Sequence, residues 1–103
     1  MASVGIVSRD VVSKNRILEV LQEKKYDMTN INTNVFDGNA FDVIIVDLTD
    51  PIALLVLRSY AHKCIAFASS NDEERIKTAK LSGCERVHKY GEFFKKILPE
   101  LKI

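Results

Sequence analysis

The stretch Phe-Asp-Val-Ile-Ile-Val-Asp-Leu-Thr-Asp-Pro, residues 41–51, decides the fold prediction for this chain. Within it an unbroken apolar run, residues 43–46, stops at a carboxylate, Asp47. Such a run is typical of a parallel β-strand that is covered on both faces. Open α/β sheets place their ligand and chemical sites at the carboxyl ends of such strands. Asp47 is therefore either a reactive residue or a polar residue that merely ends the strand.

Outward from this stretch, strand-like and helix-like segments alternate along the chain, which predicts one α/β domain over residues 1–103. Strands are expected at residues 4–8, 28–33, 43–46, 64–68 and 85–88. The third and fourth are continuously apolar and are expected at the centre of the sheet, whereas the second and fifth are polar and suit its edges. This pattern predicts a flavodoxin-like, doubly wound, five-stranded parallel sheet with strand order 2-1-3-4-5.

The expected helices are bounded by caps, glycine and proline. The first is expected at residues 11–25 after a cap at Asp10 or Ser13, and the second is at most a turn or two within residues 34–40. The third is expected at residues 51–62, starting at Asp50-Pro51. The fourth is expected at residues 73–82, between a capping box at residues 70–73 and Gly83, and a last helix precedes Pro99. The second and third helices are therefore shortened.

Composition narrows the class of protein. Fifteen Lys and Arg against fourteen Asp and Glu give a net charge of +1, which disfavours nucleic acid and anionic membranes as partners. The longest apolar run, residues 52–57, is far shorter than a membrane span, and no signal-like segment begins the chain, so a cytoplasmic protein is expected. Cys64 and Cys84 lack CxxC spacing and are expected to be reduced, buried thiols.

In the predicted strand order, several polar residues follow strands that end at one edge of the sheet. Asp10 and Asp47 should face a common crevice, and Ser69 and Lys89 should lie along the same rim. With these residues, and with Gly83-Cys84 before the last strand, the chain resembles the receiver domains of two-component response regulators over essentially its whole length.

The resemblance implies a role for each of these residues. Asp47 would accept a phosphoryl group, Ser69 would contact its oxygen, and Lys89 would pair with its charge. A carboxylate attacking a phosphoryl donor needs a divalent cation to neutralise both, and Mg²⁺ takes one or two carboxylates with water and phosphate. Asp10 and Asp47 are the candidate Mg²⁺ ligands, and Mg²⁺ is the implied cofactor.

The sequence departs from the receiver pattern beside the crevice. Ser8-Arg9-Asp10 stands where the family has an acid pair, so the paired positions are either Arg9 and Asp10 or Ser8 and Arg9. Arg9 brings a cation that could form an ion pair with Asp47 in place of a metal. Tyr90 follows Lys89 where the family commonly has proline. These departures predict an atypical, pseudo-receiver form.

Simpler roles are open for the same residues. Asp10 and Ser69 are both suited to capping the helices that follow them, and Lys89 is suited to a solvated position.

The helix after Pro51 has an apolar surface all round, including Leu54, Leu55 and Leu57. It is either an unusually buried core helix or an interface for a homodimer or another protein.

Three functions are consistent with these observations. The first is a receiver-like regulatory or protein-interaction module, not an enzyme, with weak or absent phosphorylation and with a sensor kinase or downstream regulator as partner. The second is a phosphorelay receiver phosphorylated on Asp47 with Mg²⁺. The third is a flavodoxin-like enzyme or small-molecule binder, against which stands the lack of a Gly-rich phosphate loop or a GxGxxG pattern.

Overall fold

The computed structural model describes residues 2–33 and 35–103, and Asn34, the first residue of the connection in which at most a turn or two of helix was expected, lies outside them. Its five strands form one parallel sheet in the order β2-β1-β3-β4-β5, as the sequence predicts. The strands are β1 (Ser3–Val7), β2 (Asp27–Asn30), β3 (Val43–Asp47), β4 (Cys64–Ala68) and β5 (Arg86–Lys89). β3 and β4 are buried along their whole length, whereas the edge strands β2 and β5 are mostly exposed or half-buried. The apolar runs therefore occupy the centre of the sheet.

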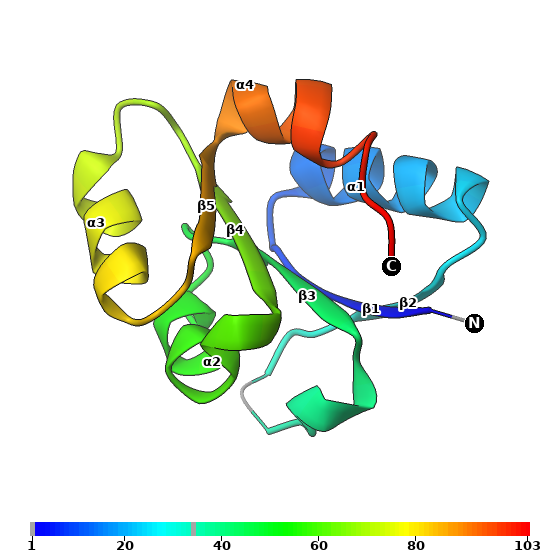
Figure 1. Cartoon of the computed structure of the whole chain (residues 1–103), viewed down its shortest axis with the longest axis horizontal. Coiled ribbons are helices and arrows are strands. Elements are labelled where there is room, and N and C mark those ends of the chain that lie inside the picture. The colour runs from blue at the N-terminus through cyan, green and yellow to red at the C-terminus, as the bar shows by residue number, and fades with distance from the viewer. Residues whose placement is uncertain (1, 34) are drawn as a thin grey trace.

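Helices cover both faces of this sheet (Figure 1). They are α1 (Val11–Glu23), the 3₁₀ turn η1 (Gly38–Ala40), α2 (Ala53–Tyr60), the 3₁₀ turn η2 (Ala61–Lys63), α3 (Glu73–Leu81), α4 (Tyr90–Glu92) and the π-helical η3 (Phe93–Ile97). α1, α4 and η3 lie on one face, and α2 and α3 lie on the other (Figure 1).

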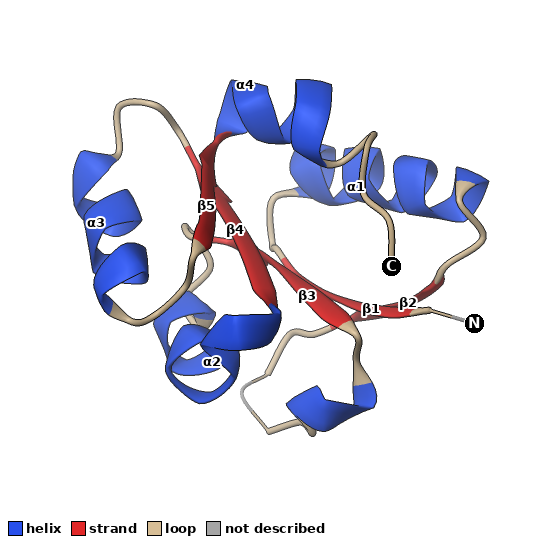
Figure 2. Cartoon of the chain, in the orientation of Figure 1, coloured by secondary structure: helices blue, strands red, loops and turns tan. Residues whose placement is uncertain are grey.

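The second and third helices of the predicted pattern are indeed short. Apart from η1, the described residues of the connection between β2 and β3 form loops and bends (Figure 2). Gly38 is needed here because a Cβ at this position would lie 2.5 Å from the ring of Tyr60. α2 has eight residues and begins at Ala53, two residues later than the Asp50-Pro51 start predicts, because Pro51 and Ile52 form a turn ahead of it.

The other helix boundaries show which polar residues act as caps. The carboxylate of Asp72 accepts the backbone N–H of Arg75 at 3.4 Å, so α3 is capped by Asp72 and not by the predicted box that begins at Ser70. Gly83 follows the end of α3 with a φ of 97°, a conformation that favours glycine and explains why the helix stops there.

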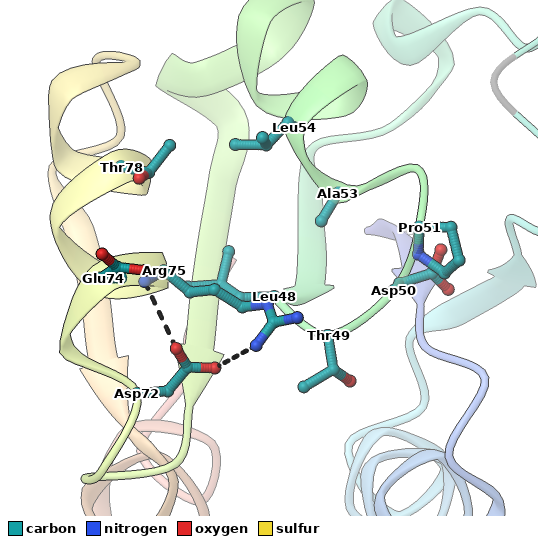
Figure 3. A pocket seen from close by; sticks show the side chains of 10 residues that line it. All are labelled: Leu48, Thr49, Asp50, Pro51, Ala53, Leu54, Asp72, Glu74, Arg75 and Thr78. Atoms are coloured by element: carbon teal, nitrogen blue, oxygen red, sulfur yellow. Dashed lines mark hydrogen bonds and ion pairs between the residues drawn. The ribbon is translucent and has the colours of Figure 1, made fainter.

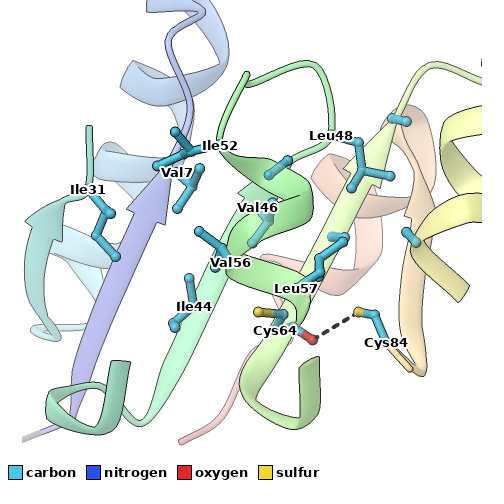
Figure 4. Close-up of a cluster of buried hydrophobic side chains, with 14 of the residues drawn as sticks. Val7, Ile31, Ile44, Val46, Leu48, Ile52, Val56, Leu57, Cys64 and Cys84 are labelled. Atoms are coloured by element: carbon cyan, nitrogen blue, oxygen red, sulfur yellow. Dashed lines mark hydrogen bonds between the residues drawn. The ribbon is translucent and has the colours of Figure 1, made fainter. Parts of the chain in front are cut away.

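Two hydrophobic clusters fill the space on either side of the sheet. One, around α1 and η3, contains the aromatic rings of Phe67, Phe93 and Phe94, with Phe67 stacked on Phe93 at a centroid distance of 4.5 Å. The other, around α2, is mostly aliphatic and includes the two cysteines (Figure 4), with the ring of Phe41 at its margin.

Cys64 and Cys84 are free, buried thiols, as expected. Burial raises the pKa of the Cys64 thiol to about 12 and also raises that of Cys84. The Cys84 Sγ donates to the backbone carbonyl of Cys64 at 3.5 Å (Figure 4). Both residues therefore serve as small core side chains.

Candidate functional site

Asp47 is the last residue of the buried central strand β3, and 5% of it is exposed. Both of its carboxylate oxygens accept hydrogen bonds. The Ser8 hydroxyl, which follows β1, donates to Oδ2 at 3.0 Å, and the backbone N–H and hydroxyl of Thr49 donate to Oδ1 at 3.0 and 2.7 Å. These three neutral donors satisfy a carboxylate that would otherwise be costly to bury. Asp47 therefore ties the β1–α1 loop to the β3–α2 loop.

Asp50, in the β3–α2 loop, is a second buried carboxylate in the same place. Its side chain is 0% exposed, and its Oδ1 accepts the backbone N–H of Ile52 at 3.0 Å. Its Oδ2 has no hydrogen-bond partner among the described residues. The closest cation is Arg9, whose Nε lies 3.7 Å from Oδ2, a charge contact longer than a hydrogen bond. Arg9 also donates to the carbonyl of Asn32 at 3.4 Å.

The cation of the β1–α1 loop thus contacts Asp50, not Asp47 as the sequence suggested. The physical reason is that β1 ends at Val7, which brings the hydroxyl of Ser8 against Asp47 and carries Arg9 further, over the β3–α2 loop. The two loops are therefore joined by two adjacent contacts, Ser8 with Asp47 and Arg9 with Asp50.

Asp10 caps α1, which is one of the two roles that the sequence left open for it. Its carboxylate accepts the backbone N–H of Ser13 at 3.2 Å and the hydroxyl of Ser13 at 2.5 Å. The hydrogen bond from the Ser13 hydroxyl, followed by that from its backbone N–H, lowers the pKa of Asp10. The carboxylate that was expected to hold a metal with Asp47 is therefore engaged by the start of its own helix.

Ser69 is the first residue after β4, and Lys89 is the last residue of β5. In the register of the sheet, Phe67 pairs with Asp47 and Ala68 pairs with Lys89, which places Ser69 beyond the end of the paired segment. The hydroxyl of Ser69 accepts the backbone N–H of Asn71 at 3.3 Å, and the residue is exposed. Lys89 is exposed as well. Contacts of these two side chains with a phosphoryl group on Asp47 stay a prediction.

The donor set can be tested for its fit to Mg²⁺, which prefers a carboxylate-rich oxygen shell. Within residues 2–33 and 35–103, no group of three or more His, Cys, Asp or Glu side chains is placed to hold a metal ion. Asp10 caps a helix, both oxygens of Asp47 accept donors, and Arg9 adds a positive charge beside Asp50. As arranged here, the residues do not fit a magnesium site.

The sequence matches no protein-family model and none of the curated proteins. Solved structures, however, match it closely in shape. A response-regulator receiver domain from Clostridium thermocellum superposes with a TM-score of 0.75 at 14% identity, over 95% of this chain and 89% of that one. The chain has the fold of a receiver domain.

Two further structures of similar fold contain a bound partner protein or a phosphorylated aspartic acid. One is the receiver domain of Ssk1 from Saccharomyces cerevisiae, crystallised with the histidine phosphotransfer protein Ypd1, with a TM-score of 0.64 and 18% identity over 86% of this chain and 78% of that one. The other is a response regulator from Burkholderia pseudomallei with a phosphorylated aspartic acid and a calcium ion, with a TM-score of 0.70 and 13% identity over 99% of this chain and 67% of that one.

Sequence reasoning missed three residues that the structure brings into the site. Ser8 was considered only as a place for a missing acid, Asp50 only as a helix cap, and Thr49 not at all. An Asp followed two residues later by Thr is a local pattern in which the carboxylate accepts the backbone N–H and hydroxyl of the later residue, so Thr49 could have been found.

The proposed interface on α2 needs one correction. Leu57 is 0% exposed and packs in the hydrophobic core, so it is not available to a partner. Leu54 and Leu55 are 38% and 44% exposed, because they lie on the side of α2 that turns away from the sheet. A surface on this helix can therefore include Leu54 and Leu55 but not Leu57.

Proposed function

We propose that this chain is a receiver-like signalling module that acts through contacts with other proteins, and that Asp47 is phosphorylated weakly or not at all. In this proposal the protein is a regulatory module and not an enzyme. Its partner is a protein of a signalling pathway, such as a sensor kinase or a downstream regulator. The receiver fold supports this class of function, and the crystallised complex of another receiver domain with a phosphotransfer protein illustrates such a partner.

The observation that carries the proposal is the identity of the residues that the β1–α1 loop presents to Asp47 and Asp50. They are a hydroxyl, Ser8, and a guanidinium, Arg9, while the one acid of the loop, Asp10, caps α1. Phosphoryl transfer to a carboxylate depends on a cation that neutralises the donor's oxygens, and a divalent metal normally supplies it. Arg9 carries one charge on a side chain that is 55% exposed, and it contacts Asp50.

Restoring the acids tests the proposal. The Ser8→Asp/Arg9→Asp variant places two carboxylates at the positions that contact Asp47 and Asp50, and we expect it to bind Mg²⁺ more tightly than the original chain by at least about tenfold. Mg²⁺ titrations followed by NMR measure binding, and intact mass after incubation with acetyl phosphate measures phosphorylation. A Ser8→Ala/Arg9→Ala variant is the matched control, because it removes the same contacts without adding acids.

The alternative function is a working phosphorelay receiver, in which Mg²⁺ assists phosphorylation of Asp47 and Lys89 pairs with the product. The position of Asp47 at the end of β3, with Lys89 ending β5 in the same sheet, favours it. In that case the original chain gains a phosphoryl mass at high Mg²⁺ concentration, and Asp47→Asn abolishes the gain. That result would contradict our proposal.

A further inference from the structure

A cavity of about 440 Å³ lies between the start of α2 and the start of α3, beside the β3–α2 loop (Figure 3). Its volume falls in the range of ligand-binding pockets, roughly 300–1,000 Å³. Apolar side chains of Leu48, Ala53 and Leu54 form part of its wall, and Asp72, Glu74 and Arg75 of the α3 side form another part. We call this cavity and its rims the α2–α3 groove.

Few apolar side chains of α3 pack against the core beside the groove. The buried residue of α3 is Ala79, and Ile76 is half-buried against the core. An alanine fills little space, and Ile76 is only half-buried, so α3 does little to fill the gap to α2. The hollow is therefore a direct consequence of the sequence of α3, where most residues are charged or polar.

Both helices carry an exposed leucine on the side of the groove. On α2, Leu54 lines the groove and is 38% exposed. On α3, Leu81 is 79% exposed, and its spacing from Glu74 and Thr78 places it on the face that lines the groove. Exposed leucines on two separate helices offer contacts to an occupant that extends beyond the cavity itself. The groove thus suits a segment of polypeptide better than a small molecule.

The polar side of the groove carries a negative charge. Asp72 and Arg75 form an ion pair at 2.7 Å, so their charges compensate each other (Figure 3). The hydrogen bond to Asp72 raises the pKa of Arg75. Glu74 is exposed and has no ion-pair partner in residues 2–33 and 35–103. An occupant with Lys or Arg beside its apolar residues would complement this surface.

We propose that the α2–α3 groove docks a basic amphipathic helix of a partner protein. An apolar side chain of that helix packs on Leu48, Ala53 and Leu54, and a Lys or Arg pairs with Glu74. An amphipathic helix lying between two helices is a recurrent mode of recognition. The inference rests on the proposed function, a protein-interaction module, and it specifies the chemistry of the partner.

The groove also lies next to the candidate phosphoacceptor. Thr49 lines the groove and donates two hydrogen bonds to Asp47. The hydrogen bond and the charge of Asp72 are the main causes of the raised pKa of Arg75, and the charge of Asp47 makes a smaller contribution. A partner in the groove therefore contacts a residue that touches Asp47 directly, which links docking to the site described above.

The probe for this inference is a synthetic helical peptide of Leu, Lys and Ala, with the Leu and Lys side chains on adjacent faces. The isotope-labelled protein is titrated with this peptide and followed by NMR, without Mg²⁺ or a phosphoryl donor. We expect shift changes to concentrate on the residues of the groove. We also expect Leu54→Ser and Glu74→Lys each to weaken binding about tenfold.

Each groove variant has a matched control at an adjacent position in the chain. Leu55 is exposed to a similar extent as Leu54, and Glu73 carries the same charge as Glu74, but neither lines the groove. Leu55→Ser and Glu73→Lys should therefore change the affinity by less than about twofold. Circular dichroism of all four variants shows whether each is folded.

Three outcomes would overturn the inference. The controls could weaken binding as much as the groove variants, which would indicate non-specific attraction. A peptide with Glu in place of Lys could bind equally well. Light scattering could also reveal a dimer that Leu54→Ser and Glu74→Lys dissociate, in which case a second copy of the chain occupies the groove. None of these outcomes affects the test of Asp47, which measures Mg²⁺ binding and a phosphoryl mass.

Discussion

The two faces of the sheet are covered in different ways. On one face, the thirteen-residue helix α1 and the segment around η3 pack large aromatic and aliphatic side chains, among them Phe67, Phe93 and Ile17, each at most 1% exposed. On the other face, α2 has eight residues, and α3 places an alanine against the sheet. We call these the packed face and the thin face. Both faces have a hydrophobic cluster, but the packed face holds the stacked aromatic rings, while the thin face carries the groove.

The difference between the two faces bears on where a partner protein would bind. Contacts that hold a helix tightly leave little surface for a partner, whereas a loosely attached helix can adjust to one. The α2–α3 groove and the β3–α2 loop with Asp50 both belong to the thin face, and the Ser8 and Arg9 contacts connect this loop to the start of α1 on the packed face. Each of the predictions below depends on this difference between the two faces.

The largest expected effect is on the packed face. Phe67→Ala removes a ring that stacks on Phe93 at 4.5 Å and meets Phe94 edge-on at 5.4 Å. We expect the free energy of unfolding to fall by about 3–5 kcal/mol. Ile76→Ala, the matched truncation on the thin face, should cost about 1 kcal/mol because that side chain is only half-buried. Urea denaturation followed by circular dichroism measures both, and equal costs would refute the distinction.

A smaller effect concerns the caps of one helix on each face. Asp10 caps α1 and Asp72 caps α3, both through their carboxylates. Asp10→Ala should lower the midpoint of global unfolding, because α1 is part of the packed face. Asp72→Ala should leave that midpoint nearly unchanged and speed amide hydrogen exchange within α3. Hydrogen exchange and urea denaturation of both variants distinguish a local loss of stability from a global one. A large fall in the global stability of Asp72→Ala would contradict the prediction.

The cap of α1 also predicts a dependence on pH. Since the folded pKa of Asp10 is lowered from its ordinary value of 3.8, its carboxylate stabilises the fold above that value and loses this contribution as the pH falls through the lowered pKa. The difference in stability between the original chain and Asp10→Ala should therefore shrink in acid. Asp10→Asn, which keeps an acceptor at the cap, serves as the control without a charge.

Most of the fold follows from the sequence. The apolar runs of β3 and β4 indicate central strands, and the alternation of segments indicates parallel order, because burial on both faces leaves few other arrangements for them. The boundaries were less accurate: β2 ends at Asn30, three residues earlier than predicted. Ile31 still donates its backbone N–H to Ile6, so the polar residues after it form a connection where a strand had been expected.

The site was less predictable, because it depends on where side chains point at the ends of strands. The sequence identified Asp47 as the residue at the end of β3, but it gave no means to choose between the two registers of Ser8-Arg9-Asp10. The choice is made by the end of β1 at Val7 together with the cap of α1, and both are tertiary details. Leu57 was misplaced for a similar reason, since six consecutive apolar residues do not reveal which side of a helix faces the core.

The smallest expected effects concern the ends of α1 and α3. α1 ends in a Schellman motif, in which Lys25 donates to the carbonyl of Gln22 at 3.0 Å and Tyr26 to that of Leu21 at 3.2 Å. Lys25 adopts a φ of 62°, a conformation that costs a residue with a Cβ about 1–2 kcal/mol. Lys25→Gly relieves this strain but adds freedom to the unfolded chain, so we expect a net gain of about 0.5 kcal/mol.

Gly83→Ala is the reverse change at the end of α3. Gly83 has a φ of 97°, and a Cβ there would lie 3.6 Å from the Cβ of Ala61, so space is available and the cost comes from the backbone alone. If the faces differ as argued, Lys25→Gly raises the midpoint of global unfolding. Gly83→Ala then appears mainly as faster hydrogen exchange in α3, because opening this helix exposes little apolar surface. A global loss in Gly83→Ala as large as about 1–2 kcal/mol would mean that α3 unfolds together with the sheet and that the thin face is not a separate unit.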